Sequence, residues 1–552
     1  MVKYLQIHPK DNVLVVLQDL PAGYQIVHND QLITLTHDVQ AKHKFTTEAL
    51  HIGDEVIMYG VLVGKAIQPI RQGELITTFN LKHEAEPYSV AKKTAYHYQT
   101  PDVSSWQGRT FMGYHRSDGS VGTRNYWLVI PLVFCENRNI AIMQDAFERE
   151  LGFAQPEKYR DQVRNLVGKL QTNSSITSLP HHQDEISNHN ESPLHKTLFP
   201  NLDGIKFLTH EMGCGGTNQD CQALAEVFAG FVVNPNVAGI TVLSLGCQKT
   251  QFDDLKQEIS KRTVGFDKPL LYFDQQTYGT EHALMTDAIA QTFAGLVEIN
   301  KIVRQPAPLS KLVVGLKCGG SDGFSGISAN PALGHLSDTL VALGATTLLA
   351  EFPELCGVEQ ELINRCETVA DAEKFAHLMD EYASQAAAVG AGFDMNPSKG
   401  NIKDGLITDA IKSAGAAKKA GYAPVAGVLN YTEQPRKAGL HVLCTPGNDV
   451  LATTGMAASG ATLIIFTTGL GTPTGNPITP TVKVSTNSRL ATRMPDIIDF
   501  DSGKIISGEE TIAQNGDAML EYLIGLASGN YLTKAEQLGQ NDFIPWRRGV
   551  NL

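Results

Sequence analysis

The chain has 552 residues, of which 42% are hydrophobic and 19% are charged, a composition typical of globular proteins. That length is too great for one compact core, so two or three domains are expected. A formal net charge of −13 repels the phosphate backbone, which excludes nucleic acid as an expected partner. An anionic ligand would need local cations, a metal ion or backbone N–H groups.

The sequence carries no recognisable signal for export or for membrane insertion. Its longest apolar runs, such as 461–466, are far shorter than the roughly 20 residues that cross a bilayer. The first residues contain no apolar stretch followed by a small-residue cleavage site. The eight cysteines form no CxxC pair. We therefore expect a cytoplasmic protein with reduced thiols and no membrane partner.

Residues 1–83 are predicted to form a small β-rich domain. Short apolar runs separated by Gly, Asn and Asp are expected to be its strands: 13–17, 32–35, 55–61 and 75–79. Residues 84–107 have no regular apolar periodicity and are interpreted as a linker.

From residue 108 onward, strand-like runs alternate with helix-length amphipathic stretches, which predicts an α/β main body with mostly parallel sheets. A Pro-containing break at 306–309 divides it into two α/β domains, 108–305 and 306–552. A polar insertion, 166–200, interrupts the first domain. Its four histidines have no regular ligand spacing, which favours a solvated insertion over a metal-binding tract: His181, His182, His189 and His195.

Six predicted strands end in clusters of glycine and small polar residues. These strands are 204–208, 239–245, 312–316, 346–350, 441–443 and 463–466. Ligands of open parallel sheets bind outside the carboxyl ends of the strands, and glycine lets the backbone approach them closely. We therefore expect the clusters to line one polar site at one sheet edge. The alternative is that each cluster is an ordinary βα turn.

The clusters supply candidates for each part of such a site. His210 is a candidate general base, and Asp322 is a second candidate for catalysis. The candidates for substrate binding are Ser321, Asn330, Thr468 and Gly469. The candidate metal ligands are Cys214, Cys247, Cys318, Glu351 and Glu354. Thiolates suit iron or zinc and carboxylates suit magnesium or manganese; an iron–sulfur cluster on the three cysteines is a further option that no local spacing supports.

Two other features bear on ligand binding. Arg116 and Arg124 flank a turn at Asp118, and an arginine fork matches a carboxylate; the alternative is structural pairing with Asp118. The segment 469–475 is similar to the GxGxxG fingerprint of dinucleotide sites, but its third glycine comes one place late and Pro473 opposes a helix there. NAD is therefore not expected.

Longer runs resemble the altronate/galactarate dehydratase family over nearly the whole chain. Residues 38–45 are similar to the D-x-x-x-G-H-K segment of its N-terminal SAF domain, and residues 113–125 to the opening of its main body. The run CGGSDGFSGISANPA, 318–332, is the most specific match, and 467–473 also fits. The resemblance implies a small SAF-like domain followed by Rossmann-like α/β sheets.

The resemblance also implies a function. Members of the altronate/galactarate dehydratase family eliminate water from a hexonic or hexaric acid and give a 2-keto-3-deoxy product. It implies a divalent metal, Fe²⁺ or Mn²⁺ with Mg²⁺ as an alternative, and a homodimer. In the small domain, His43 becomes a second candidate base and Lys44 a candidate carboxylate clamp, on a domain that would close over the site.

Several positions depart from the family pattern. Lys42 stands where glycine is usual, and Thr77-Thr78-Phe79-Asn80 replaces a His-x-His-Asn run. The other departures are Lys399 for Pro, Ile402 for Lys, Leu470 for Arg and Thr474 for Tyr. They predict a substrate other than altronate or a reduced activity. A sulfolactate-type sulfo-lyase and a non-catalytic sugar-acid binding protein remain the alternatives.

Overall fold

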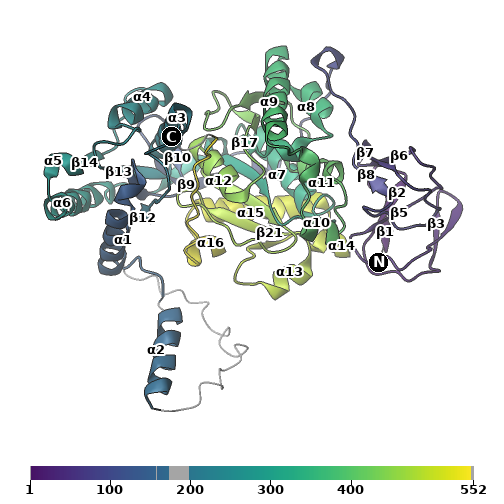
Figure 1. Ribbon diagram of the computed structural model, residues 1–552, viewed down its shortest axis with the longest axis horizontal. Coiled ribbons are helices and arrows are strands. Elements are labelled where there is room, and N and C mark those ends of the chain that lie inside the picture. The colour runs from purple at the N-terminus through teal and green to yellow at the C-terminus, as the bar shows by residue number, and fades with distance from the viewer. Residues whose placement is uncertain (1, 157, 173–197, 549–552) are drawn as a thin grey trace.

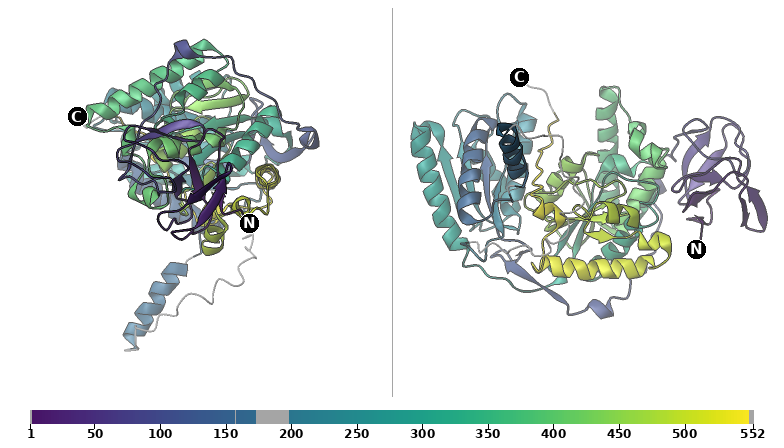
Figure 2. Two further views of the ribbon diagram at one scale, coloured as in Figure 1. Left: turned by 90° about the vertical axis from the view of Figure 1, so that its right-hand side faces the viewer. Right: turned by 90° about the horizontal axis from the view of Figure 1, so that it is seen from below.

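The computed structural model describes residues 2–156, 158–172 and 198–548. Figure 1 shows three bodies in a row, which we name by their sheets: a small β-rich domain, a seven-stranded domain in the middle and a four-stranded domain at the far end. The right panel of Figure 2 shows the same order. The last domain of the chain therefore lies between the two that precede it in sequence.

The small domain is built from short antiparallel strands. They are β1 (Tyr4–Leu5), β2 (Val13–Val16), β3 (Gln25–His28), β4 (Gln31–Thr34), β5 (Lys44–Thr46), β6 (Glu55–Met58), β7 (Val61–Ala66) and β8 (Leu81–Lys82). The order is β1-β2-β5 in one sheet, β6-β7-β8 in another, and β3-β4 as a hairpin. The predicted strand at 75–79 is wrong, because Leu75 makes only an isolated bridge with Phe45 and Thr77–Asn80 forms a turn closed by the Asn80 side chain.

The linker expected at 84–107 crosses the seven-stranded domain with little regular structure. It contains only the 3₁₀ turns η1 (Val90–Lys92) and η2 (Ser104–Trp106). The Tyr88 hydroxyl donates to Asp380 at 2.7 Å, and Ser89 N–H donates to Gln360 at 2.9 Å. These bonds hold the segment on the surface of that domain.

The four-stranded domain has parallel strands in the order β12-β11-β13-β14. They are β11 (Tyr126–Pro131), β12 (Gly204–Phe207), β13 (Val237–Ser244) and β14 (Leu270–Asp274). Its helices are α1 (Asn137–Leu151), α2 (Lys158–Gln171), α3 (Asn218–Val233), α4 (Phe252–Arg262), α5 (Gln275–Tyr278) and α6 (Glu281–Ile299). Alternate residues of β11 enter two different cores, one shared with α1 and α6 and the other with α3 and α4. Helices therefore cover both faces, as parallel sheets require.

The seven-stranded domain is also fully parallel, in the order β18-β19-β17-β16-β20-β21-β22. Its strands are β16 (Val313–Cys318), β17 (Thr346–Leu349), β18 (Val425–Leu429), β19 (Gly439–Leu443), β20 (Leu463–Thr468), β21 (Thr481–Ser485) and β22 (Phe500–Asp501). Its helices are α7 (Ala329–Ala342), α8 (Glu359–Arg365), α9 (Val369–Ala388), α10 (Lys399–Lys403), α11 (Asp409–Ala417), α12 (Asp449–Ala458), α13 (Ser488–Arg493), α14 (Lys504–Ser507), α15 (Ile512–Ala527) and α16 (Lys534–Gln537).

A small antiparallel sheet joins the two α/β domains. It contains β9 (Thr110–His115), β10 (Val121–Gly122) and β15 (Gln305–Pro308). The predicted boundary at 305/306 falls inside β15, which pairs with β9. The domain limits stay a prediction. Residues 166–171 of the predicted polar insertion belong to α2, whereas its four histidines lie outside the described residues.

All six strands expected to end in glycine-rich clusters are present, but they do not share one edge. β12 and β13 belong to the four-stranded sheet, and the other four belong to the seven-stranded sheet. The prediction of a single sheet edge is wrong, because helices α3 and α12 pack between the sheets, where a Cβ at Gly230 would lie 2.2 Å from Ala458 O. In the part of the chain that the structure describes, no helix is both long and apolar enough to span a membrane.

Candidate active site

The loop that follows β16 is the first part of the site. Asp322 is fully buried there, and its Oδ1 accepts from Ser325 Oγ at 3.1 Å while its Oδ2 accepts from Thr486 Oγ1 at 3.0 Å. A Cβ at Gly469 would lie 2.2 Å from Asp322 Cγ, so only glycine fits beside this carboxylate. Two strand-end clusters, after β16 and β20, thus enclose one charged group.

The small domain supplies cations to this carboxylate. Lys42 Nζ lies 3.0 Å from Asp322 Oδ2 and 2.8 Å from Asp404 Oδ1, and Lys44 Nζ donates to Gly405 O at 2.6 Å. Lys42 has φ of 79°, the left-handed conformation that favours glycine. We name these residues the junction site: Lys42, His43, Lys44, Asp322 and Asp404. The structure thus brings the candidates His43, Lys44 and Asp322 together across a domain boundary.

Burial tunes the three basic groups of the junction site differently. Burial would lower the pKa of Lys42, but Asp322 and Asp404 raise it above the ordinary value. Burial lowers the pKa of Lys44 to about 7, and Asp322 only partly offsets this. Burial also lowers the pKa of His43. At neutral pH, Lys42 is therefore positively charged and the imidazole of His43 is neutral.

A second group of buried charges lies at the ends of β16, β17 and β19. We name it the lysine–carboxylate cluster: Lys317, Cys318, Glu351, Glu354, Lys412, Lys419 and Asp449. Lys317 Nζ lies 2.7 Å from both Glu351 Oε1 and Asp449 Oδ1. Lys412 Nζ lies 2.6 Å from Glu354 Oε1. Lys419 Nζ donates to Cys318 Sγ at 2.7 Å, and the thiol donates to Glu354 Oε2 at 3.3 Å.

The two glutamates of this cluster differ in protonation. Burial and the adjacent Glu354 raise the pKa of Glu351 to about 8. Burial would raise the pKa of Glu354 as well, but Lys412, Lys419 and Lys317 hold it below the ordinary value. Glu351 has φ of 72°, and its Oε2 has no hydrogen-bond partner within the described residues. One carboxylate and one protonated carboxyl therefore lie side by side.

The predicted metal ligands Cys318, Glu351 and Glu354 do lie together, with one ligand atom from each within 4.8 Å of the others. Each of them, however, already contacts a lysine ammonium. Burial and Glu354 raise the pKa of the Cys318 thiol to about 11, so it is not a thiolate. A divalent ion would have to displace ammonium groups and a thiol proton. These residues do not fit a metal ion.

A different group has suitable donors and no ion-paired lysine. His83, Cys356 and Asp409 also place their ligand atoms within 4.8 Å of one another. His83 follows β8 of the small domain, and Asp409 begins α11. Both Asp409 oxygens lack a well-formed hydrogen bond among the described residues, although the Cys356 thiol adjoins them. This mixed set matches the donors that bind zinc or iron.

The candidate substrate-binding residues of the seven-stranded domain have two kinds of role. Ser321 Oγ is buried without a hydrogen-bond partner among the described residues, so it is available to a ligand. Asn330 instead donates to Gly415 O at 2.9 Å and accepts from Thr467 at 2.6 Å. Thr468 Oγ1 accepts from two N–H groups of the following loop. Asn330 and Thr468 therefore shape the site.

The candidates in the four-stranded domain lie apart from these charges. His210 donates from Nε2 to Pro131 O at 2.8 Å and accepts at Nδ1 from Met212 N–H at 2.9 Å, and burial lowers its pKa to about 4. Both ring nitrogens are thus occupied, which supports a structural role and opposes the interpretation as a general base.

The two arginines are also occupied. Arg116 donates to Pro235 O at 2.8 Å and to Asn125 Oδ1 at 3.1 Å. Arg124, fully buried, forms a forked pair with Glu536 at 2.8 and 3.1 Å. Neither pairs with Asp118, which accepts from Ser120 instead. This geometry favours a structural role for both, in place of the carboxylate binding inferred from sequence.

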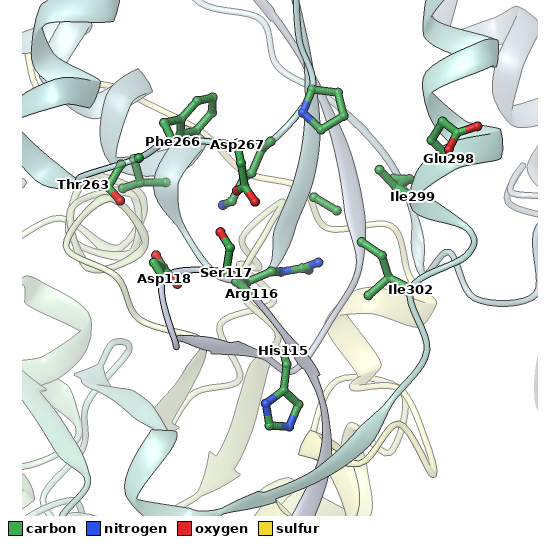
Figure 3. A pocket seen from close by; sticks show the side chains of 15 residues that line it. His115, Arg116, Ser117, Asp118, Thr263, Phe266, Asp267, Glu298, Ile299 and Ile302 are labelled. Carbon is green, nitrogen blue, oxygen red and sulfur yellow. The ribbon is translucent and has the colours of Figure 1, made fainter.

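A pocket of about 280 Å³ lies beside Arg116, between the turn after β9 and the segment around Asp267 (Figure 3). The two cations that line it, Arg116 and Lys268, both donate to backbone carbonyls. None of its lining residues belongs to the junction site or to the lysine–carboxylate cluster. We therefore do not assign the substrate to this pocket.

Several residues of the site had no sequence prediction. Lys317 interrupts an apolar strand directly before Cys318, which is a signal that buried charge is needed there. Lys412 and Lys419 lie in α11 and in the 3₁₀ turn that follows it (Lys418–Ala420), where no local pattern indicated them, whereas Asp449 belongs to the polar cluster that follows the predicted strand at 441–443. Cys135 follows β11 as Cys247 follows β13, so the rule that selected Cys247 would also have selected Cys135.

The departures from the family pattern fall at different places. Lys42 enters the junction site, whereas Phe79 is 80% exposed and Thr77 caps a turn. Leu470 lies beside Gly320 at the rim of the β16 loop. Lys399 begins α10, which is held to that loop by Asn401 donating to Ser321 O at 2.7 Å.

Together, buried lysines, carboxylates and a neutral histidine at the carboxyl edge of a parallel sheet define an α/β enzyme of acid–base chemistry. Three family models cover most of the chain: the altronate/galactarate dehydratase SAF domain at residues 2–84, the D-galactarate dehydratase/altronate hydrolase second domain at 113–300, and the D-galactarate/altronate dehydratase C-terminal domain at 309–551. The chain belongs to the altronate/galactarate dehydratase family.

Curated relatives match along nearly their whole length. Altronate dehydratases of Bacillus subtilis and Escherichia coli are 31% and 32% identical to this chain, with full coverage of both partners. The galactarate dehydratase (L-threo-forming) of Escherichia coli is 30% identical over 97% of this chain and 95% of its own.

Proposed function

We propose that this protein is a hydro-lyase that removes water from a sugar acid, such as altronate or galactarate, to give a 2-keto-3-deoxy sugar acid. The observation that carries the proposal is the junction site, where Lys42 pairs with the buried Asp322 and with Asp404, next to the half-buried His43 and the buried Lys44. The altronate and galactarate dehydratases that match the chain support the same reaction.

The junction site offers groups that this elimination needs. The reaction removes the proton from the carbon beside the substrate carboxylate and expels hydroxide from the next carbon. We assign the carboxylate to Lys42, because its ammonium has three donors, Asp322 and Asp404 take two of them, and its side chain is 19% exposed. We assign proton removal to His43. Its side chain is half-buried, and this burial lowers its pKa and keeps the imidazole neutral. Lys44 is buried and positions the loop through Gly405.

A proton donor for the departing hydroxide is available in the lysine–carboxylate cluster. With a pKa of about 8, Glu351 keeps its proton at neutral pH. Its Oε2 has no partner in the described part of the chain and is free to donate to a ligand. Lys317 holds the other oxygen at 2.7 Å and fixes the orientation of the carboxyl group.

Acid–base groups alone fall short of the barrier reduction that enzymes reach. One base contributes roughly 10²–10⁴-fold, about 3–5 kcal/mol, against at least about 8 kcal/mol for enzymes in general. The proposal therefore includes a divalent metal, Fe²⁺ or Mn²⁺ with Mg²⁺ as an alternative, which when bound would neutralise developing charge. The poor fit of Cys318, Glu351 and Glu354 argues for a site elsewhere. A cytoplasmic homodimer, implied by the family, belongs to the same proposal.

The test is turnover of a panel of aldonic and aldaric acids with Fe²⁺, Mn²⁺ or Mg²⁺ added without oxygen. Formation of a 2-keto-3-deoxy product from one acid, lost on adding chelator, supports the proposal and identifies the substrate and the metal. Turnover that survives exhaustive chelation would remove the metal from it. No product with any acid and metal would contradict the dehydratase assignment.

The same assay separates the alternatives. Release of sulfite from sulfolactate without dehydration of any sugar acid would establish the sulfo-lyase. Binding of a sugar acid without turnover, and without dependence on metal, would establish a binding protein. A panel read for keto acid, sulfite and heat of binding distinguishes all three.

A further inference from the structure

Three cysteines lie on neighbouring loops at the carboxyl edge of the four-stranded sheet. Cys135 follows β11, Cys214 follows β12 and Cys247 follows β13, and β11 lies between the other two strands in parallel register. All three are free and exposed, whereas Cys318, Cys366 and Cys444 are buried. A free thiol is ordinarily among the most buried side chains, so three exposed ones at one edge need an explanation.

Backbone contacts hold the three loops together. Phe134 N–H, next to Cys135, donates to Met212 O at 3.0 Å, two residues before Cys214. Lys249 N–H, two residues after Cys247, donates to Gly213 O at 2.9 Å. Gly213 has φ of 96°, and a Cβ there would lie 2.2 Å from Leu132 O, so only glycine lets the loops approach this closely.

The three thiols lie on loops that contact each other, but they do not form a set compact enough for one ion. A single ion with metal–sulfur bonds of about 2.3 Å would hold its thiolates roughly 4 Å apart. Within the described residues, the two sets of three ligand atoms that lie within 4.8 Å of one another do not include these cysteines. The spacing of the three thiols favours a larger bound group than a single ion.

The thiol edge faces the domain that holds the proposed acid–base groups. Helix α3 begins just after Cys214, α12 begins at Asp449 of the lysine–carboxylate cluster, and the two helices pack together. The C-terminal tail contacts both helices. Ile544 N–H donates to Thr454 of α12 at 3.3 Å, and Arg548 N–H donates to Asp220 in the first turn of α3 at 2.8 Å.

We propose that Cys135, Cys214 and Cys247 bind an iron–sulfur cluster through three thiolates. A cubane cluster has four irons and ordinarily takes four cysteines, so three leave one iron without a protein ligand. That iron would accept an oxygen of the sugar acid as a Lewis acid, with no electron transfer. This catalytic use rests on the proposed function, whereas binding of the cluster does not.

The experiment is reconstitution of the full chain with Fe²⁺ and sulfide without oxygen, followed by desalting. We expect about four irons and four acid-labile sulfides per chain in the wild type, with visible charge-transfer absorption. Cys135→Ser, Cys214→Ser and Cys247→Ser should each lose most of this content. Cys318→Ser and Cys366→Ser, which remove buried thiols, should keep it.

Three outcomes would overturn the proposal: a wild type that binds no sulfide, full cluster content in a Cys135→Ser chain, or loss of content in Cys318→Ser alone. Should a serine variant fail to fold, alkylation of the wild type gives a second measurement. The three thiols should react with iodoacetamide in the cluster-free protein and be protected at least tenfold after reconstitution. Equal labelling before and after would overturn the proposal.

Failure of the proposed function looks different. A chain that holds the cluster but turns over no sugar acid would leave the cluster site standing and remove the dehydratase assignment. A chain that turns over a sugar acid with Mn²⁺ or Mg²⁺ and holds no sulfide would do the reverse.

Discussion

At the scale of single residues, His43 is the group on which the proposed proton transfer depends. We expect His43→Gln to lower kcat/KM by roughly 10²–10⁴-fold, since glutamine cannot accept the proton. Burial lowers the pKa of His43 below 6.5, and the neutral ring is the base. Wild-type kcat/KM should therefore fall as the pH drops through the pKa of His43, and it should fall again above about pH 8, where Glu351 loses the proton assigned to the leaving hydroxide.

The pH profile distinguishes this role from a structural one. In His43→Gln the acid limb should disappear along with most of the rate. His37→Gln, an exposed histidine of the same domain, should leave both rate and profile unchanged. An acid limb that persists in His43→Gln would assign the titration, and the base, to another group.

Lys42 tests whether a departure from the family pattern sets binding of the substrate. Lys42→Gly should raise KM about tenfold and change kcat less, because the charge that holds the carboxylate is lost. Lys42→Met should raise KM similarly but melt at a lower temperature than Lys42→Gly, since methionine keeps the strained φ of 79° at a cost of about 1–2 kcal/mol. Steady-state kinetics and thermal melts measure both, and a wild-type KM in Lys42→Met would contradict the assignment.

At the scale of elements, local patterns identified the strands but not their partners. Strand ends such as 204–208 and 463–466 were visible because a parallel strand buried on both faces is a short apolar run with a glycine-rich end. Which strands share a sheet depends on how α3 and α12 pack, and no local pattern encodes that contact. His43, Lys44 and Asp322 were therefore identified singly, and only the fold shows that they meet.

The first turn of α11 contains a buried carboxyl that we expect to destabilise the fold. Thr408 already caps this helix, and both oxygens of Asp409 lack a well-formed hydrogen bond among the described residues. Burial raises the pKa of Asp409 well above 3.8. The contribution of Asp409 to the free energy of unfolding is therefore most favourable below about pH 3.8, where the carboxyl is protonated. It becomes less favourable as the pH rises and the buried group must ionise.

Asp409→Asn removes this dependence. At pH 8 with chelator present, we expect the variant to be more stable than the wild type by about 1–3 kcal/mol, a difference that shrinks toward pH 4. Asp380→Asn, an exposed position whose amide oxygen can still accept from Tyr88, should not be stabilised. Thermal melts at both pH values measure the effect. A lower midpoint for Asp409→Asn in chelator would contradict it, and one seen only with metal present would make Asp409 a ligand.

At the scale of the whole molecule, the C-terminal tail joins the two α/β domains. Phe543 stacks on Phe228 of the four-stranded domain at 5.9 Å between ring centroids, and Trp546 meets Tyr431 of the seven-stranded domain edge-on at 5.3 Å. The tail adds to the contact between α3 and α12, so it helps to fix the thiol edge relative to the lysine–carboxylate cluster.

The double substitution Phe543→Ala with Trp546→Ala should therefore loosen the interface between the domains without unfolding either. Each truncation of a half-buried ring costs roughly 1–3 kcal/mol, and we expect calorimetry to resolve two unfolding transitions where the wild type has one. Ile544→Ala, an exposed position in the same segment, should keep the single transition. If the double variant keeps its iron and sulfide but loses turnover, the reaction needs both edges held together. If it keeps full turnover, the two edges act separately, and the thiol site has no part in the elimination.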